Sequence, residues 1–183
     1  EIGVPQLMIT QDYTSGVFIY GDYVYYATPN TTKNMEGQIE SSYLDFKRTK
    51  LDGSETKKDY YVQLSDNSTP YRYVQENGTV YLLYADATNS EIHSVNTETG
   101  VNTVLVSGYT DYAFDTNTES GTVYYTMAVA KRNTYPSTSN ESYNQLYKVS
   151  ASATESPYEI DLSDGYTDSS KKEGDEGYEI CLL

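Results

Sequence analysis

The sequence predicts an all-β protein, and three observations lead to this fold class. Tyrosine and threonine, which suit the half-buried surface of a sheet, are abundant, with 22 Tyr among 183 residues. No long window places apolar side chains at helical spacing. A turn that contains glycine, followed by a strand rich in valine and tyrosine, occurs three times, at residues 21–27, 77–84 and 120–126.

Each copy of this motif belongs to a unit of four expected strands. The units cover about residues 14–64, 70–107 and 109–162, and residues 163–183 are expected to be a loop and the start of a further strand. Polar residues predict long loops between the second and third strands of the first and third units, at Thr28–Ser41 and Asn133–Ser142.

The spacing of the units predicts a particular all-β architecture. The motif valines, Val24, Val80 and Val123, recur at intervals near the roughly 40–50 residues of a β-propeller blade. The strand Val80–Tyr84 is apolar throughout, which is typical of a strand covered on both faces. We therefore predict about three four-stranded blades of a β-propeller. Because a ring needs about four or more blades, we expect a larger ring, closed by the rest of a longer chain or by another chain.

Charge and composition exclude several classes of partner. The formal net charge is −15, so the chain repels phosphate backbones and we expect no nucleic-acid partner. No apolar run is long enough to span a bilayer, so direct insertion of this segment into a membrane is not expected. The single cysteine, Cys181, cannot form an intramolecular disulfide.

The first unit also resembles a known repeat family. Its residues Gly21–Tyr26 and Phe46–Ser54 follow the pattern of a G-D-x-[IV]-Y-Y strand and a later strand ending in L-D-G-S. This pattern resembles the YWTD-type repeat of low-density-lipoprotein-receptor propellers, and it is closer to bacterial relatives of unknown function on secreted proteins and lipoproteins of Gram-positive bacteria. The second and third units match it only in part. The resemblance implies a propeller and an extracellular or cell-surface location, and it carries no catalytic residues.

We expect ligand contacts in the long loops, because insertions on one face of a repeat protein often form its binding face. The candidate ligand-binding residues are Asn133, Tyr135 and Tyr143, in and beside the loop of the third unit. Tyrosines within the apolar strands are expected instead to pack between blades. They are Tyr25, Tyr26, Tyr81, Tyr84, Tyr124 and Tyr125.

The sequence assigns no catalytic residue, no metal ligand and no cofactor. A calcium site is the alternative to the absence of a cofactor, because Asp161–Asp168 contains closely spaced oxygen ligands and a glycine. This segment lacks the terminal glutamate of the helical calcium loop. His93 is the only histidine, so we expect no His-rich zinc site, and we expect His93 to decorate an outer strand.

These observations favour a non-catalytic extracellular module that recognises a protein or a carbohydrate, or acts as a scaffold, at the bacterial cell surface. Two alternatives stay open. A propeller-type polysaccharide hydrolase or lyase predicts carboxylates and tyrosines gathered at the mouth of a central channel. A structural subunit of a surface assembly predicts self-association into a defined oligomer.

Overall fold

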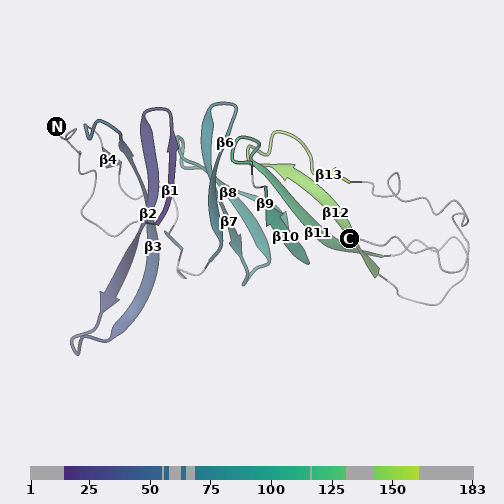
Figure 1. Cartoon of the computed structure of the whole chain (residues 1–183). Coiled ribbons are helices and arrows are strands. Elements are labelled where there is room, and N and C mark those ends of the chain that lie inside the picture. Colours follow the sequence, from purple (N-terminus) through teal and green to yellow (C-terminus); the bar gives the residue numbers. More distant parts are fainter. Residues whose placement is uncertain are drawn as a thin grey trace, which may run out of the picture.

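The computed structural model describes residues 15–54, 56–57, 63–64, 69–115, 117–130 and 142–160. Within these ranges the chain forms strands and turns and contains no helix, so the expectation of an all-β chain is confirmed for this part of the protein. The strands form three antiparallel sheets that follow one another along the chain (Figure 1).

The first sheet contains five strands in four positions. Strands β1, β2 and β3 pair in sequence, and both β4 and β5 pair with β3 at different points along its length. The two short strands therefore share the fourth position of this sheet. The strands are β1 (Ser15–Tyr20), β2 (Tyr23–Lys33), β3 (Ile39–Lys50), β4 (Thr56–Lys57) and β5 (Gln63–Leu64).

The second and third sheets each have four strands, paired in the order of the chain. The second sheet consists of β6 (Tyr71–Glu76), β7 (Thr79–Asp86), β8 (Glu91–Asn96) and β9 (Asn102–Ser107). The third sheet consists of β10 (Asp111–Phe114), β11 (Thr122–Ala130), β12 (Ser142–Ser150) and β13 (Tyr158–Glu159).

Tight turns at the predicted glycines join the first and second strands of the first two sheets. Asn77 and Gly78 both have a positive φ, 51° and 84°, which is the backbone of a type I′ hairpin turn. Gly21, the first of two turn residues, has a φ of 57°. Such turns match the right-handed twist of their strands and set the pairing register.

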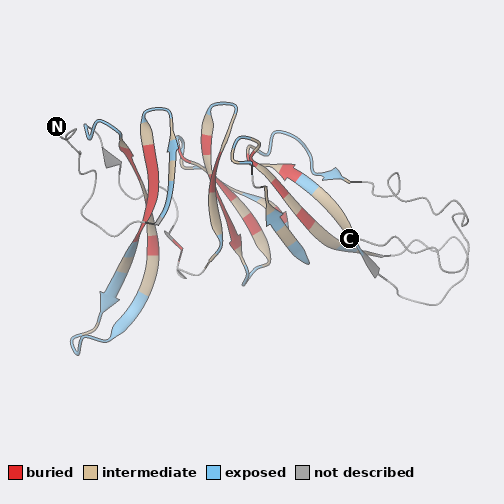
Figure 2. Ribbon diagram, in the orientation of Figure 1, coloured by how far each residue is buried: buried red, intermediate tan, exposed pale blue. Residues whose placement is uncertain are grey.

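One predicted loop is wrong. Residues Thr28–Ser41 were expected to be a loop because they are polar, but β2 continues to Lys33 and β3 begins at Ile39. Only the residues between them form a turn, and the hairpin projects beyond the rest of its sheet (Figures 1 and 2). Backbone pairing needs no apolar side chains, so a polar sequence can continue a ladder into solvent.

The second sheet is packed between the other two. In β7, Val80 and Leu82 belong to the core shared with the first sheet, whereas Leu83 belongs to the core shared with the third sheet. Successive strand residues point to opposite faces, so β7 is buried on both sides, as its continuous apolar sequence predicts. Burial of each such side chain contributes roughly 1.5–3 kcal/mol.

The tyrosines of the apolar strands lie mainly in these cores. Tyr25, Tyr26, Tyr84 and Tyr125 are at most 7% exposed. Tyr81 and Tyr124 are half-buried. Their principal role is therefore packing.

Burial of the tyrosines predicts a loss of stability at alkaline pH. The pKa values of Tyr25, Tyr84 and Tyr125 are raised above the ordinary 10.0, chiefly because burial disfavours the charged phenolate. A raised pKa in the folded chain favours the protonated form, so this stability is fully present below about pH 10 and is lost as the pH rises above it. We expect urea unfolding at about pH 9 and about pH 11 to show this loss, with tyrosinate absorbance reporting the titration.

Two variants distinguish this cause from a general effect of base. Tyr125→Phe removes one buried phenol and should reduce the loss. Tyr158→Phe, on a ring that is 62% exposed, should keep the loss of the unsubstituted protein. An unfolding free energy that stays constant across this pH range would contradict the explanation.

The two ends of the sheets differ in their chemistry. At the end where first and second strands are joined (the first-turn end), polar contacts connect neighbouring sheets. The Glu76 carboxylate accepts hydrogen bonds from the Ser152 backbone N–H at 2.8 Å and hydroxyl at 3.0 Å, and Arg48 forms an ion pair with Glu98. The opposite end, where second and third strands are joined at residues 34–38 and 87–90 (the second-turn end), carries the projecting hairpin.

Candidate functional site

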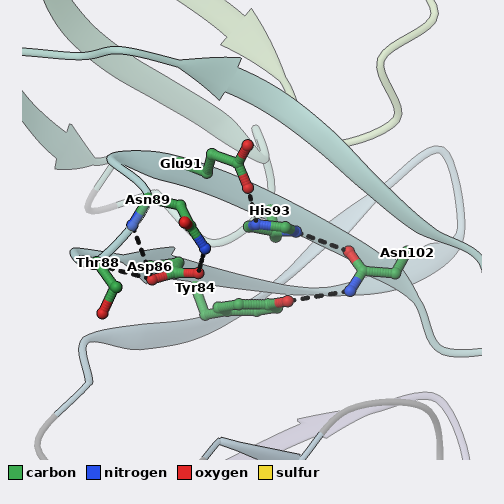
Figure 3. A network of polar contacts seen from close by, with 7 residues as sticks. All are labelled: Tyr84, Asp86, Thr88, Asn89, Glu91, His93 and Asn102. Atoms are coloured by element: carbon green, nitrogen blue, oxygen red, sulfur yellow. Dashed lines mark hydrogen bonds and ion pairs between the residues drawn. The ribbon is translucent and has the colours of Figure 1, made fainter.

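The candidate site is a polar network at the second-turn end of the second sheet, around the turn between β7 and β8 (Figure 3). It combines the turn residues with side chains from the two strands and from the start of β9. The residues are Tyr84, Asp86, Thr88, Asn89, Glu91, His93 and Asn102.

Asp86 organises the turn. Its Oδ1 accepts hydrogen bonds from the backbone N–H groups of Thr88 at 2.9 Å and Asn89 at 3.3 Å, and its Oδ2 accepts one from Asn89 Nδ2 at 2.7 Å. These hydrogen bonds, that of the Asn89 side chain first, lower the pKa of Asp86, and they outweigh a small opposing effect of desolvation. The carboxylate is therefore ionised at neutral pH.

The register of the hairpin aligns the remaining groups. Asp86 pairs with Glu91, and Tyr84 pairs with His93. Because side chains two residues apart share a face of a strand, all four point to the face of the second sheet that looks toward the first sheet. This hairpin therefore brings together a phenol, an imidazole and two carboxylates.

His93 is held from two sides. Its ring stacks on Tyr84 with a centroid distance of 4.7 Å and an interplanar angle of 8°. Its Nδ1 lies 3.1 Å from Asn102 Oδ1, while Asn102 Nδ2 donates to the Tyr84 hydroxyl at 3.0 Å. Its Nε2 lies 3.1 Å from Glu91 Oε2, also within hydrogen-bond distance, and which ring nitrogen donates depends on the tautomer of the imidazole.

Three groups of the network offer donor atoms to a cation. One ligand atom each from Asp86, Glu91 and His93 lies within 4.8 Å of the others. All three residues are half-buried, and the His93 side chain is 13% exposed. His93 is thus a fixed, partly buried group and not the surface decoration that its place on an outer strand suggested.

The structure does not test the candidate residues that the sequence suggested. Asn133 and Tyr135 lie outside the described residues, as does the calcium candidate Asp161–Asp168. The backbone of Tyr143 lies in β12 opposite Val129, and its side chain is outside the described part of the chain.

A signal for the network does exist in the sequence. Tyr84 and Asp86, then Glu91 and His93, stand at the two-residue spacing of a strand face on either side of a four-residue turn. Pairing the two strands symmetrically about that turn aligns all four side chains. The individual residues carry no such signal, since acidic residues are abundant in this chain.

Comparison with known proteins does not assign the site. No protein-family model and no curated protein sequence matches the chain. The described residues contain no helix able to cross a membrane.

Proposed function

We propose that the chain forms consecutive blades of a β-propeller and acts as a non-catalytic module that recognises a protein partner at the bacterial cell surface. The observation that carries the choice of a protein partner is the hairpin of β2 and β3, which extends into solvent from the second-turn end.

The arrangement of the sheets supports the propeller. Three consecutive sheets have four strand positions each, pair in chain order, and pack through two separate hydrophobic cores. Consecutive four-stranded antiparallel sheets packed face to face are the building plan of a propeller. The location at the cell surface rests on the resemblance of the first unit to the YWTD-like repeats of exported bacterial proteins.

The projecting hairpin has the properties of a surface for peptide recognition. Nearly all of its residues from Pro29 to Ser41 are exposed. Within the described part of the chain, β2 pairs only with β3 beyond Ala27, and no described strand lies on its other edge. Ile39, which is 65% exposed, and Met35, which is fully exposed, add apolar contacts. An open edge with apolar side chains suits the addition of a partner strand.

The described residues also form two hollows that a small ligand could occupy. A groove of about 260 Å³ lies between the second and third sheets, lined by Tyr81, Ser94, Asn96 and Ser152 among others, and a hollow of about 480 Å³ lies at the projecting hairpin, lined by Lys33, Asn34, Met35, Glu36 and Glu40. Sites for small molecules usually measure about 300–1,000 Å³. The larger hollow lies on the projecting hairpin itself, so the choice of a macromolecular partner rests on the strand edge and the exposed apolar side chains of that hairpin and not on volume.

A random peptide library displayed on phage tests this function. Peptides selected on the immobilised chain should bind at least about tenfold more weakly to the double variant Met35→Ser/Ile39→Ser, because both apolar contacts of the hairpin are removed. Val17→Ser/Ile19→Ser is the matched control, since both residues are 60% exposed on β1 of the same sheet, away from the hairpin. The affinities are measured by surface plasmon resonance.

Two results would contradict the proposal. Selected peptides that bind both double variants equally would remove the hairpin from recognition. Binding restricted to immobilised glycans, with no peptide enriched, would replace the protein partner with a carbohydrate.

A further inference from the structure

We propose that Asp86, Glu91 and His93 form a binding site for a divalent transition-metal ion of the zinc type. The site would lie at the second-turn end, on the turn between β7 and β8 (Figure 3). This inference rests on the hairpin of β7 and β8 and does not depend on the proposed recognition function of the hairpin of β2 and β3.

The distance between two of the donor atoms already suits a metal. Zinc binds imidazole nitrogen and carboxylate oxygen at roughly 2.0–2.2 Å in a tetrahedron, so two such ligands lie about 3.3 Å apart. His93 Nε2 and Glu91 Oε2 are 3.1 Å apart. An ion can therefore bind both atoms with little movement of either side chain.

Asp86 supplies the third ligand. Its carboxylate lies within 4.8 Å of the other two donor atoms, so a rotation of its side chain would bring it to the same ion. The turn holds the carboxylate in place through Thr88 and Asn89, and each carboxylate oxygen has two lone pairs. A rotation toward the ion would exchange some of these hydrogen bonds for the metal contact.

The surroundings of His93 are those of a ligating histidine. A metal-bound imidazole usually donates its other ring N–H to a carbonyl or carboxylate, which orients the ring. Here the partner of Nδ1 is Asn102 Oδ1, and Tyr84 orients both the amide and the ring. Nε2, the other ring nitrogen, faces the Glu91 carboxylate at hydrogen-bond distance. A metal ion bound by both atoms would take the place of the proton in this contact.

The donor set selects the class of ion. Calcium and magnesium prefer oxygen ligands, and calcium takes about six to eight of them. One nitrogen and two carboxylates suit zinc and its neighbours among the divalent transition metals. Three protein ligands leave a coordination position for water or for a donor atom of a bound partner.

Isothermal titration of the full chain with zinc ions alone tests this site. A Cys181→Ser background removes the only thiol. We expect one zinc ion per chain, and loss of that binding in both His93→Ala and Glu91→Gln. Glu91→Gln keeps the size of the side chain, so it stays informative if the alanine variant folds poorly. Asn102→Ala should weaken binding about 10–100-fold, because it removes only the orienting hydrogen bond.

Asp52→Asn is the matched control for Asp86→Asn. Asp52 also accepts a backbone N–H in a turn, from Ser54 at 2.8 Å, but no histidine stands beside it in the hairpin. We expect Asp86→Asn to weaken zinc binding and Asp52→Asn to leave it unchanged. Because His93 is the only histidine, its imidazole NMR signals should shift on addition of zinc and report directly on coordination.

The proposal would be overturned if zinc bound with equal strength to the unsubstituted chain, to His93→Ala and to Glu91→Gln. It would also be overturned if the unsubstituted chain did not bind zinc. Either result would leave the contact between Glu91 and His93 as a hydrogen bond between two half-buried side chains. Binding of calcium in preference to zinc would also overturn it, because His93 would then have no part in the site.

Discussion

Replacing Leu82 by alanine is expected to lower the free energy of unfolding by about 2–5 kcal/mol. Leu82 lies in β7, has no exposed surface, and packs in the core between the first and second sheets. Truncation of the side chain loses the favourable free energy of moving its atoms from water into the core. It also leaves a cavity that the surrounding residues fill only in part. Strand backbones on both sides restrict the collapse of that cavity, since β7 is held between two cores.

Urea unfolding followed by circular dichroism measures this loss. Leu51→Ala is the matched control, because Leu51 is 41% exposed in the turn after β3 and belongs to neither core. We expect Leu51→Ala to change the stability by less than about 0.5 kcal/mol. A similar small effect of Leu82→Ala would mean that the two sheets do not pack in solution as they do in the structure.

Replacing Glu98 by glutamine is expected to lower the free energy of unfolding by about 1–3 kcal/mol. Arg48 is only 5% exposed at the end of β3, and its guanidinium forms an ion pair with Glu98 in the turn between β8 and β9. Burial alone lowers the pKa of Arg48, but hydrogen bonds to Glu98 and to Tyr25 outweigh it and raise the pKa. The glutamine variant therefore keeps a buried charge without its counter-charge.

The two partners of this pair should respond unequally. Glu98 is 54% exposed, so water screens the pair and the loss stays below that of a fully buried pair. For the same reason, water can solvate the Glu98 carboxylate in Arg48→Met. The methionine also keeps apolar packing on the ring of Tyr23, whose centroid lies 4.6 Å from the Arg48 guanidinium carbon. We expect Arg48→Met to cost less stability than Glu98→Gln.

Equilibrium unfolding of both variants at one pH tests this order. Glu36→Gln, an exposed acid in the turn between β2 and β3, corrects for the change in net charge. An equal loss in Arg48→Met and Glu98→Gln would indicate that the contact itself, and not the isolated buried charge, determines the effect. A loss in Glu36→Gln as large as in Glu98→Gln would assign the effect to net charge.

Local sequence patterns were sufficient for most of the sheet structure. Glycine turns such as Asn77–Gly78 appear where φ must be positive, and the continuous apolar run in β7 identified a strand with two covered faces. Both signals are local, because a turn depends on its own residues and burial depends on the side chains themselves. The chain was therefore recognisable as a series of packed antiparallel sheets.

The same rules failed where a strand leaves the core. Residues Thr28–Ser41 have the polarity of a loop, and nothing in their composition distinguishes a loop from a solvated hairpin. Pairing with the apolar parts of β2 and β3 extends the ladder outward, so the outcome depends on the neighbouring residues. Pro29 fits there because β1 no longer pairs with β2 at that point.

The sequence by itself determined that the described part of this protein is all-β, where its tight turns lie, and that strand β7 is buried on both faces. Only the tertiary structure decided which side chains meet at the surface. Tyr84, Asp86, Glu91 and His93 form one network because hairpin register places them on one face, and Asn102 joins them from β9. The physical reason is the distance along the chain over which each property is set. Turn geometry and the apolar character of a strand depend on a few neighbouring residues, whereas a site depends on the relative positions of several strands.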